Sequence, residues 1–159
     1  MSGSRAHSYR IDLEWRGNCG TGTSEYRAYS REYAIAGPGK PELIGSADPA
    51  FLGDASHYNP EDLLVASLSA CHMLWYLHLC ADAGVTVTAY RDDAGGTMEK
   101  VADGGIAFTE VVLAPRVTVS PDSDRERAAA LHEDAHARCF IARSVNFPVR
   151  CRPEIEVAG

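Results

Sequence analysis

Cys71 is the residue whose type and setting most strongly suggest chemistry in this chain. It lies near the middle of an uncharged, largely apolar stretch, residues 63–81, which has the length of a long helix. A second cysteine, Cys139, lies far downstream at the end of another predicted helix. A thiol in an apolar helix, with a distant second thiol and few other nucleophiles, suggests peroxide chemistry more than packing.

A reactive thiolate needs a cation nearby, because burial in apolar surroundings alone raises the pKa of a thiol. Arg27 and Arg31 are two candidates, on a segment predicted to be a strand. A carboxylate such as Glu61 can hold an arginine side chain bidentately beside the sulfur. The choice between Arg27 and Arg31 stays open, because the register of the strand decides which side chain points inward.

A free cysteine is often only a small buried side chain, and this alternative applies to Cys71 too. Cys80 follows nine residues later, nearly on the opposite side of the helix, and is expected to be structural. Cys19 and Cys151 have no local feature that indicates chemistry. None of the five cysteines forms a Cys-x-x-Cys pair, which argues against a compact structural zinc site.

A zinc hydrolase is a further alternative, because His132-Glu133-x-x-His136 matches the H-E-x-x-H pattern on a predicted helix. Such a site needs a third protein ligand, and no histidine follows His136. The charged residues around the motif instead indicate a solvated helix face. His72 and His78 are expected to be interior histidines with hydrogen-bond partners, and no metal site is predicted.

The elements that must position these residues follow from the apolar pattern and from Gly and Pro breaks. Asn59 is a suitable cap, Pro60 suits the first helical position, and Gly84 ends the long helix. The order of strands and helices predicts an α+β fold in a single domain, residues 1–159. The predicted strands are 8–16, 25–35, 85–90, 97–101, 106–119 with a break at Pro115, and an edge strand within 145–157, and the second helix is 123–138.

A helix that is apolar on all sides is expected to be buried on all sides, which a chain of 159 residues achieves more easily as a homodimer. A membrane span is the alternative, but the stretch contains serines and histidines and has acidic flanks. The net charge of −7 argues against nucleic acid and anionic membranes as partners. No export signal is apparent, so a cytoplasmic location with free thiols is expected.

The residues also resemble a known family. The block Asn59-Pro60-Glu61-Asp-Leu-Leu, followed by Ala66-Ser-Leu-Ser-Ala-Cys71, is similar to the peroxidatic helix of the OsmC/Ohr proteins, which are thiol peroxidases for hydroperoxides. The segment 26–30 resembles the arginine strand of that family. The segment 135–139 resembles the helix that carries its resolving cysteine. The resemblance extends over nearly the whole chain.

The resemblance implies a fold, a mechanism and partners. The fold would be an interwoven homodimer whose long central helices pack against antiparallel sheets, with active sites at the subunit interface. Cys71 would be the peroxidatic nucleophile, activated by Arg27 with Glu61 orienting the guanidinium, and Cys139 would resolve its sulfenic acid as a disulfide. No cofactor is expected; an external dithiol reductant, of lipoyl type or thioredoxin-like, would reopen the disulfide.

Two departures from the family pattern bear on this mechanism. The family often has proline directly after the resolving cysteine, where this chain has Phe140. The segment 36–58 is longer than is usual in the family and would border the site. The alternative function is a protein of the same fold that binds an apolar ligand between its subunits and has no peroxidase activity.

Overall fold

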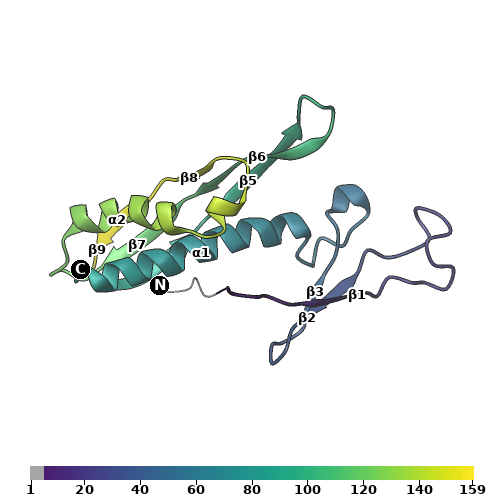
Figure 1. Cartoon of the computed structure of the whole chain (residues 1–159), viewed down its shortest axis with the longest axis horizontal. Helices are drawn as coiled ribbons and strands as arrows, with labels where there is room; N and C mark the ends of the chain where they lie inside the picture. Colours follow the sequence, from purple (N-terminus) through teal and green to yellow (C-terminus); the bar gives the residue numbers. More distant parts are fainter. Residues whose placement is uncertain (1–5) are drawn as a thin grey trace. The chain divides into compact units, whose positions relative to one another are not determined.

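The computed structural model describes residues 6–159. The chain divides into two compact units, Met1–Leu63 and Leu64–Gly159. The elements are two long helices and nine short strands in three sheets, which is an α+β fold as predicted (Figure 1). The organisation of the whole chain as one domain stays a prediction.

The first unit contains one antiparallel sheet and shows that the predicted strand 25–35 is mostly wrong. The residues 21–29 form turns and bends, and pairing in this region begins only at Tyr33. The strand predicted at 8–16 is also shorter than expected. The sheet has the order β1-β2-β3, formed by β1 (Asp12–Trp15), β2 (Tyr33–Ala36) and β3 (Leu43–Gly45).

Side-chain contacts explain why the segment between β1 and β2 is a loop. The indole N–H of Trp15 donates to the carbonyl of Ser30 at 2.9 Å. The guanidinium of Arg31 lies 4.6 Å from the centre of the Tyr26 ring and 4.0 Å from that of Tyr29, and it donates to the carbonyls of both tyrosines. These contacts satisfy backbone groups that a strand would pair with a neighbour.

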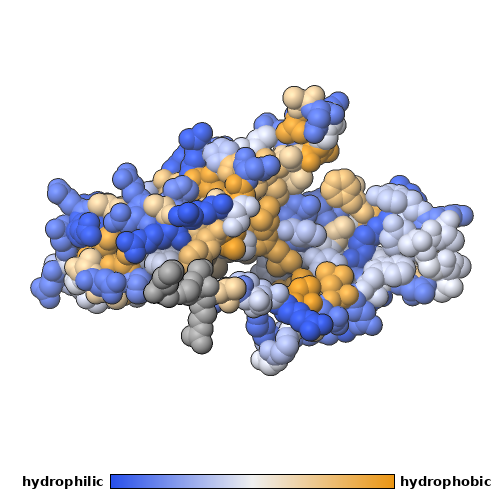
Figure 2. All heavy atoms as spheres, viewed as in Figure 1, coloured by the Kyte–Doolittle hydropathy of each residue, from blue (hydrophilic) through white to orange (hydrophobic). Residues whose placement is uncertain are grey.

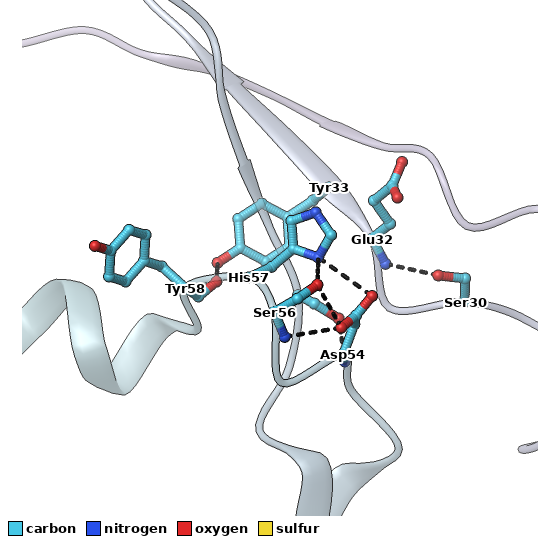
Figure 3. A network of polar contacts seen from close by, with 8 residues as sticks. Ser30, Glu32, Tyr33, Asp54, Ser56, His57 and Tyr58 are labelled. Atoms are coloured by element: carbon cyan, nitrogen blue, oxygen red, sulfur yellow. Dashed lines mark hydrogen bonds and ion pairs between the residues drawn. The ribbon is translucent and has the colours of Figure 1, made fainter.

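A compact turn precedes the long helix. Both the backbone N–H and the hydroxyl of Ser56 donate to the carboxylate of Asp54, at 2.8 and 2.7 Å, and His57 Nδ1 lies 3.4 Å from the same carboxylate (Figure 3). These hydrogen bonds lower the pKa of Asp54. The next residue, Tyr58, bridges to Gly45 on β3. The start of the helix is thereby tied to the first sheet.

The long helix α1 (Pro60–Asp82) begins and ends where the sequence predicts. The side chain of Asn59 accepts from the N–H of Asp62 at 2.8 Å, and the Asp62 carboxylate accepts from the N–H of Asn59 at 3.2 Å. This reciprocal pair satisfies two backbone donors at the N-terminus. At the other end Gly84 adopts a φ of 71°, and the N–H of Val85 donates to the Cys80 carbonyl at 2.9 Å. This is a Schellman cap.

In the second unit, both long helices pack on one mixed sheet. The second helix α2 (Arg125–Arg138) is capped by Asp124, whose side chain accepts from the N–H of Arg127. One core cluster joins Tyr76 and Leu79 of α1 to Leu131 and other residues of α2, and to Val117 of the sheet. The sheet has the order β4-β7-β9, with β9 parallel to β7, and consists of β4 (Val87–Asp92), β7 (Pro115–Val119) and β9 (Glu154–Val157).

The third sheet, of order β5-β6-β8, lies against an earlier part of α1. Leu68 of α1 packs with Val111 and Leu113 of this sheet in a second core cluster. The hairpin of β5 and β6 extends away from the helices, and Met98 and Ile106 on it are exposed (Figures 1 and 2). The strands are β5 (Gly95–Lys100), β6 (Ile106–Leu113) and β8 (Val149–Cys151), and β8 is parallel to β6.

Within a single chain α1 is not buried on all sides, and its burial by a second subunit stays a prediction. Only 28% of its most apolar stretch is buried, and Leu74 is 63% exposed. By length and composition α1 is apolar enough to cross a membrane, although a core helix of a soluble protein meets the same criterion. Its contacts with two sheets and with α2 are those of a core helix with one face left uncovered.

Candidate functional site

The thiols of Cys71 and Cys139, far apart in the sequence, lie close enough in the second unit for Cys71 to raise the pKa of Cys139. Cys71 lies on α1 and is partly exposed, whereas Cys139 caps the C-terminus of α2 and is buried. The two helices that carry them run side by side (Figure 1). The arrangement therefore brings the two sequence-predicted cysteines together.

Burial, with a smaller contribution from the adjacent Cys71 thiol, raises the pKa of the Cys139 thiol to about 11. The backbone N–H of Ala142, whose nitrogen is 3.5 Å from the Cys139 sulfur, acts in the opposite direction. Cys139 is therefore a protonated thiol at neutral pH. Of the two sulfurs, that of Cys71 is the more accessible to a small molecule.

The helix ends at Cys139 without the proline that the family often has after it. Cys139 has extended backbone angles, with φ −63° and ψ 111°, and its N–H donates to the carbonyl of His136 at 3.3 Å. A 3-10 turn (Ala142–Ser144) follows, and the N–H of Arg143 donates back to the Cys139 carbonyl at 3.1 Å. These hydrogen bonds hold the cysteine in place, so Phe140 does not prevent a sharp end to the helix.

An open apolar groove lies along the same face of α1 as Cys71. Leu74, Trp75 and His78 follow Cys71 at helical spacing and line the groove, whose volume is about 300 Å³. Phe140, the residue after Cys139, closes one side, with its ring centre 5.4 Å from that of Trp75 in an edge-to-face contact. The residues that line the groove therefore follow closely after Cys71 and Cys139 in the sequence.

The two other predicted site residues, Arg27 and Glu61, belong to the first unit. Arg27 is exposed in a turn, not on the predicted strand, and the described part of the chain contains no ion pair between it and Glu61. Glu61 is half-buried in the first turn of α1. Arg31, the other candidate arginine, is held by Tyr26 and Tyr29. The roles of Arg27 and Glu61 stay predictions.

A second cluster of reactive side chains lies in the core of the second unit, and the sequence did not indicate it. His72 of α1 and His132 of α2 are both buried, with His72 Nε2 2.9 Å from His132 Nδ1. Cys151 of β8 completes the cluster, its sulfur 3.6 Å from the His72 nitrogen and 3.9 Å from the His132 nitrogen. The ring of Tyr76 stacks on that of His132 at 3.8 Å.

Three predictions about these residues are corrected by this geometry. His132 does not lie on a solvated helix face, because an apolar side of α2 turns it into the core. His72 is interior and has a partner at Nε2, as predicted, although its Nδ1 has none, whereas His78, also predicted to be interior, has a side chain that is 60% exposed. Cys151 is part of a cluster and not a bystander. The signal was present in the spacing of Ala128, Leu131 and Ala135, which places His132 on the apolar face of α2.

Burial determines the protonation of this cluster. It lowers the pKa of His72 to about 4, with His136 acting in the same direction, and lowers that of His132 to about 3, with His72 adding to the effect. Burial, together with the charge of Asp92, raises the pKa of Cys151 to about 12. At neutral pH the cluster therefore consists of two neutral imidazoles and a protonated thiol.

Comparison with known proteins identifies the class. The family model described as OsmC-like protein matches residues 53–154, which is more than half of the chain. An OsmC-like protein of unknown function from Vibrio cholerae O1 has a similar structure, with a TM-score of 0.84 and 30% identity, over 94% of this chain and 99% of that one. The chain therefore belongs to the OsmC-like protein family.

Two further relatives carry names that describe an activity. Peroxiredoxin OsmC of Escherichia coli (strain K12) is 31% identical over 85 residues, which are 54% of this chain and 58% of the length of that relative. An organic hydroperoxide resistance protein from Elizabethkingia anophelis has a TM-score of 0.67 at 19% identity, over 97% of this chain and 100% of that one. The second likeness concerns the fold alone.

Proposed function

We propose that the protein is a thiol peroxidase that reduces organic hydroperoxides, and hydrogen peroxide less well, with Cys71 as nucleophile. The observation that carries the proposal is the pairing of the Cys71 and Cys139 thiols, one partly exposed and one buried. Membership of the OsmC-like family and the name of the peroxiredoxin relative support it.

The reaction has three balanced steps. The Cys71 thiolate attacks the outer peroxide oxygen, the O–O bond breaks, and the alcohol leaves with a proton, so that the sulfur becomes a sulfenic acid. The Cys139 sulfur then attacks the Cys71 sulfur, and water leaves as the disulfide forms. An external dithiol, lipoyl-type or thioredoxin-like, restores both thiols by exchange and becomes a disulfide itself. The cycle needs no bound cofactor.

Arg27 is the cation proposed to stabilise the Cys71 thiolate and to hydrogen-bond the peroxide, with Glu61 orienting it. The contacts of Arg31 support the choice of Arg27, because the Arg31 guanidinium already stacks on two rings and donates to two carbonyls. Arg27 lies exposed in the turn that Arg31 stabilises. In this proposal, the guanidinium of Arg27 and the carboxylate of Glu61 would form an ion pair once the peroxide-binding site is assembled.

The apolar groove beside Cys71 supports an organic substrate. Its lining of Leu74, Trp75 and Phe140 would bind the alkyl or aryl part of a hydroperoxide while the peroxide group reaches the thiol. A homodimer in the cytoplasm is proposed as the working form. The same groove favours the second candidate function, the binding of an apolar ligand without peroxidase activity.

The test is a brief, stoichiometric pulse of cumene hydroperoxide on the reduced protein, followed by peptide mass spectrometry. We expect a Cys71–Cys139 disulfide in the native sequence and a trapped sulfenic acid on Cys71 in Cys139→Ser. Cys80→Ser is the matched control, since Cys80 is a buried thiol on the same helix, and it should leave the result unchanged. An unmodified Cys71 would refute the peroxidase and leave the ligand-binding function.

The rate of Cys71 oxidation in the same pulse experiment distinguishes the roles of Arg27 and Arg31. Arg27→Gln should slow Cys71 oxidation on the order of 100-fold, because it removes the charge that stabilises the thiolate and the peroxide. Arg31→Gln should act mainly on the stability of the loop. The reverse order of effects would assign the role to Arg31.

A further inference from the structure

We propose that His72, His132 and Cys151 bind a single transition-metal ion of the zinc class, at a site distinct from the thiol pair. The three side chains come from α1, α2 and β8, and their ligand atoms all lie within 4.8 Å of one another. This inference does not depend on the peroxidase function, because neither Cys71 nor Cys139 is a ligand.

The distances between the ligand atoms fit a tetrahedral ion. Zinc–nitrogen bonds of ~2.0 Å and zinc–sulfur bonds of ~2.3 Å place tetrahedral ligand nitrogens ~3.3 Å apart and nitrogen and sulfur ~3.6 Å apart. The structure has 2.9 Å between the nitrogens, and 3.6 and 3.9 Å from the sulfur to each of them. The nitrogen separation is that of the hydrogen bond between the two rings, and it would widen by about 0.4 Å when an ion binds between them.

Three buried polar atoms without a partner lie in or near the cluster. Among the described residues, the buried side-chain nitrogen and oxygen atoms without a hydrogen-bond partner are His72 Nδ1, His132 Nε2 and Tyr90 Oη. Two belong to the cluster, and the ring of Tyr90 contacts that of Tyr76, which stacks on His132. The two cluster atoms are the outer ring nitrogens, which would carry the N–H of each imidazole when the inner nitrogens bind an ion, and ordered water would accept from them.

The chemistry of the donors suits the zinc class. One inner nitrogen carries the proton of the hydrogen bond between His72 and His132, and binding an ion would move that proton to the outer nitrogen of the same ring, so that both inner nitrogens offer a lone pair. Binding replaces the proton of the Cys151 thiol by a metal–sulfur bond, and that proton passes to solvent. The nearby carboxylate of Asp92, whose charge acts on Cys151, would partly offset the charge of the ion. Two imidazoles and one thiolate form a borderline-soft set that disfavours magnesium and calcium.

The surroundings hold the ligands in place and leave a path for the ion. Tyr76 fixes the His132 ring by stacking and donates its own hydroxyl hydrogen to the Ala128 carbonyl at 3.0 Å. A pocket of about 290 Å³ is lined by His132 and Cys151 and also by Glu133 and His136. The fourth coordination position would face this pocket, where water or His136 can occupy it. The H-E-x-x-H motif thus contributes its first histidine to a site whose other ligands lie elsewhere in the sequence.

The test uses Co²⁺ as a probe for the reduced, metal-stripped protein in a Cys71→Ser, Cys139→Ser background, so that the peroxidase thiols cannot bind the ion. We expect binding of one equivalent, with a thiolate-to-cobalt charge-transfer band and the visible bands of a tetrahedral ion. Zn²⁺ should displace the cobalt. Cys151→Ser should abolish the charge-transfer band and weaken binding by more than ~100-fold, and His132→Gln should weaken it comparably.

Cys80→Ser, in the same background, is the matched control and should keep both the band and the affinity. A band that persists in Cys151→Ser, or no binding by the parent protein, would overturn the proposal. If Cys151→Ser does not fold, the rate at which Cys151 is alkylated in the parent protein tests the proposal instead. Zn²⁺ should slow the reaction of Cys151 with iodoacetamide at least tenfold and leave exposed Cys19 unaffected, whereas equal rates with and without Zn²⁺ would refute the site.

Discussion

At the scale of the residue, the two paired thiols differ in a way that assigns their order of action. Cys139 is buried at the end of α2, and its pKa is raised to about 11, so that it is kept as a thiol. Cys71 is partly exposed beside an apolar groove. In the proposed cycle, a peroxide arriving from solvent would therefore meet Cys71 first, and Cys139 would act only after Cys71 had been oxidised.

The rate of disulfide formation should depend on pH through Cys139. A thiol whose pKa is raised forms its thiolate only as the pH rises, so the resolving rate should increase about tenfold per pH unit between about 7 and 9. Burial is the main cause of the shift and persists after Cys71 is oxidised. Quenched-flow measurement of sulfenic acid decay would check this. A flat profile would show that Cys139 loses its proton by another route.

The groove makes a prediction about substrate preference. Trp75→Ala removes the largest apolar surface of the groove and should raise KM for cumene hydroperoxide about tenfold, while leaving the reaction with hydrogen peroxide within a factor of two or so. The same measurement on Trp15→Ala, a tryptophan outside the groove, provides the control. Equal losses for both peroxides in Trp75→Ala would mean that the groove does not bind substrate.

At the scale of the element, the sequence predicts the helices well and one strand poorly, for identifiable reasons. The Asn59 cap, Pro60 and Gly84 are local signals, and each appears in the structure with its expected hydrogen bonds. The loop between β1 and β2 depends on Arg31 stacking on two tyrosines, which alternation of apolar residues cannot reveal. The proximity of Cys71 and Cys139 was predicted from the family resemblance. The cluster of His72, His132 and Cys151 could not be predicted, because it depends on how three elements pack together.

The cap of α1 gives a prediction about stability. Asn59→Ala removes the acceptor for the N–H of Asp62 and should lower the free energy of unfolding by about 1 kcal/mol. Urea denaturation followed by circular dichroism measures this. Asn18→Ala is a suitable control, since Asn18 accepts from Gly20 and Gly22 in a turn away from any helix. An equal loss in both variants would indicate a general effect of removing asparagine.

At the scale of the whole molecule, the uncovered face of α1 indicates a missing neighbour. The helix α1 carries no charged residue from Leu63 to Ala81, yet most of this apolar stretch lies outside the core of a single chain. Met98 and Ile106, on the β5–β6 hairpin, are also exposed apolar residues. A second copy of the chain would bury such a surface, in agreement with the homodimer predicted from the sequence.

The oligomeric state can be tested on that face. The native protein is expected to sediment as a dimer, and Leu74→Glu should shift it toward monomer, because Leu74 is 63% exposed on α1 in the single chain. Ala137→Glu, which places the same charge on the exposed face of α2, should remain dimeric. A native monomer at micromolar concentration would contradict the prediction and leave the apolar face to another partner.

The stacking of Arg31 on Tyr26 and Tyr29 has a consequence for proteolysis. Trypsin must draw an arginine side chain into its own pocket, and Arg31 is already bound by two rings and two carbonyls, whereas Arg27 is exposed in a turn four residues earlier. Limited digestion should therefore cut the segment 17–32 after Arg27 first, as mass spectrometry of the fragments can determine. Initial cleavage after Arg31 would show that the stack opens readily in solution.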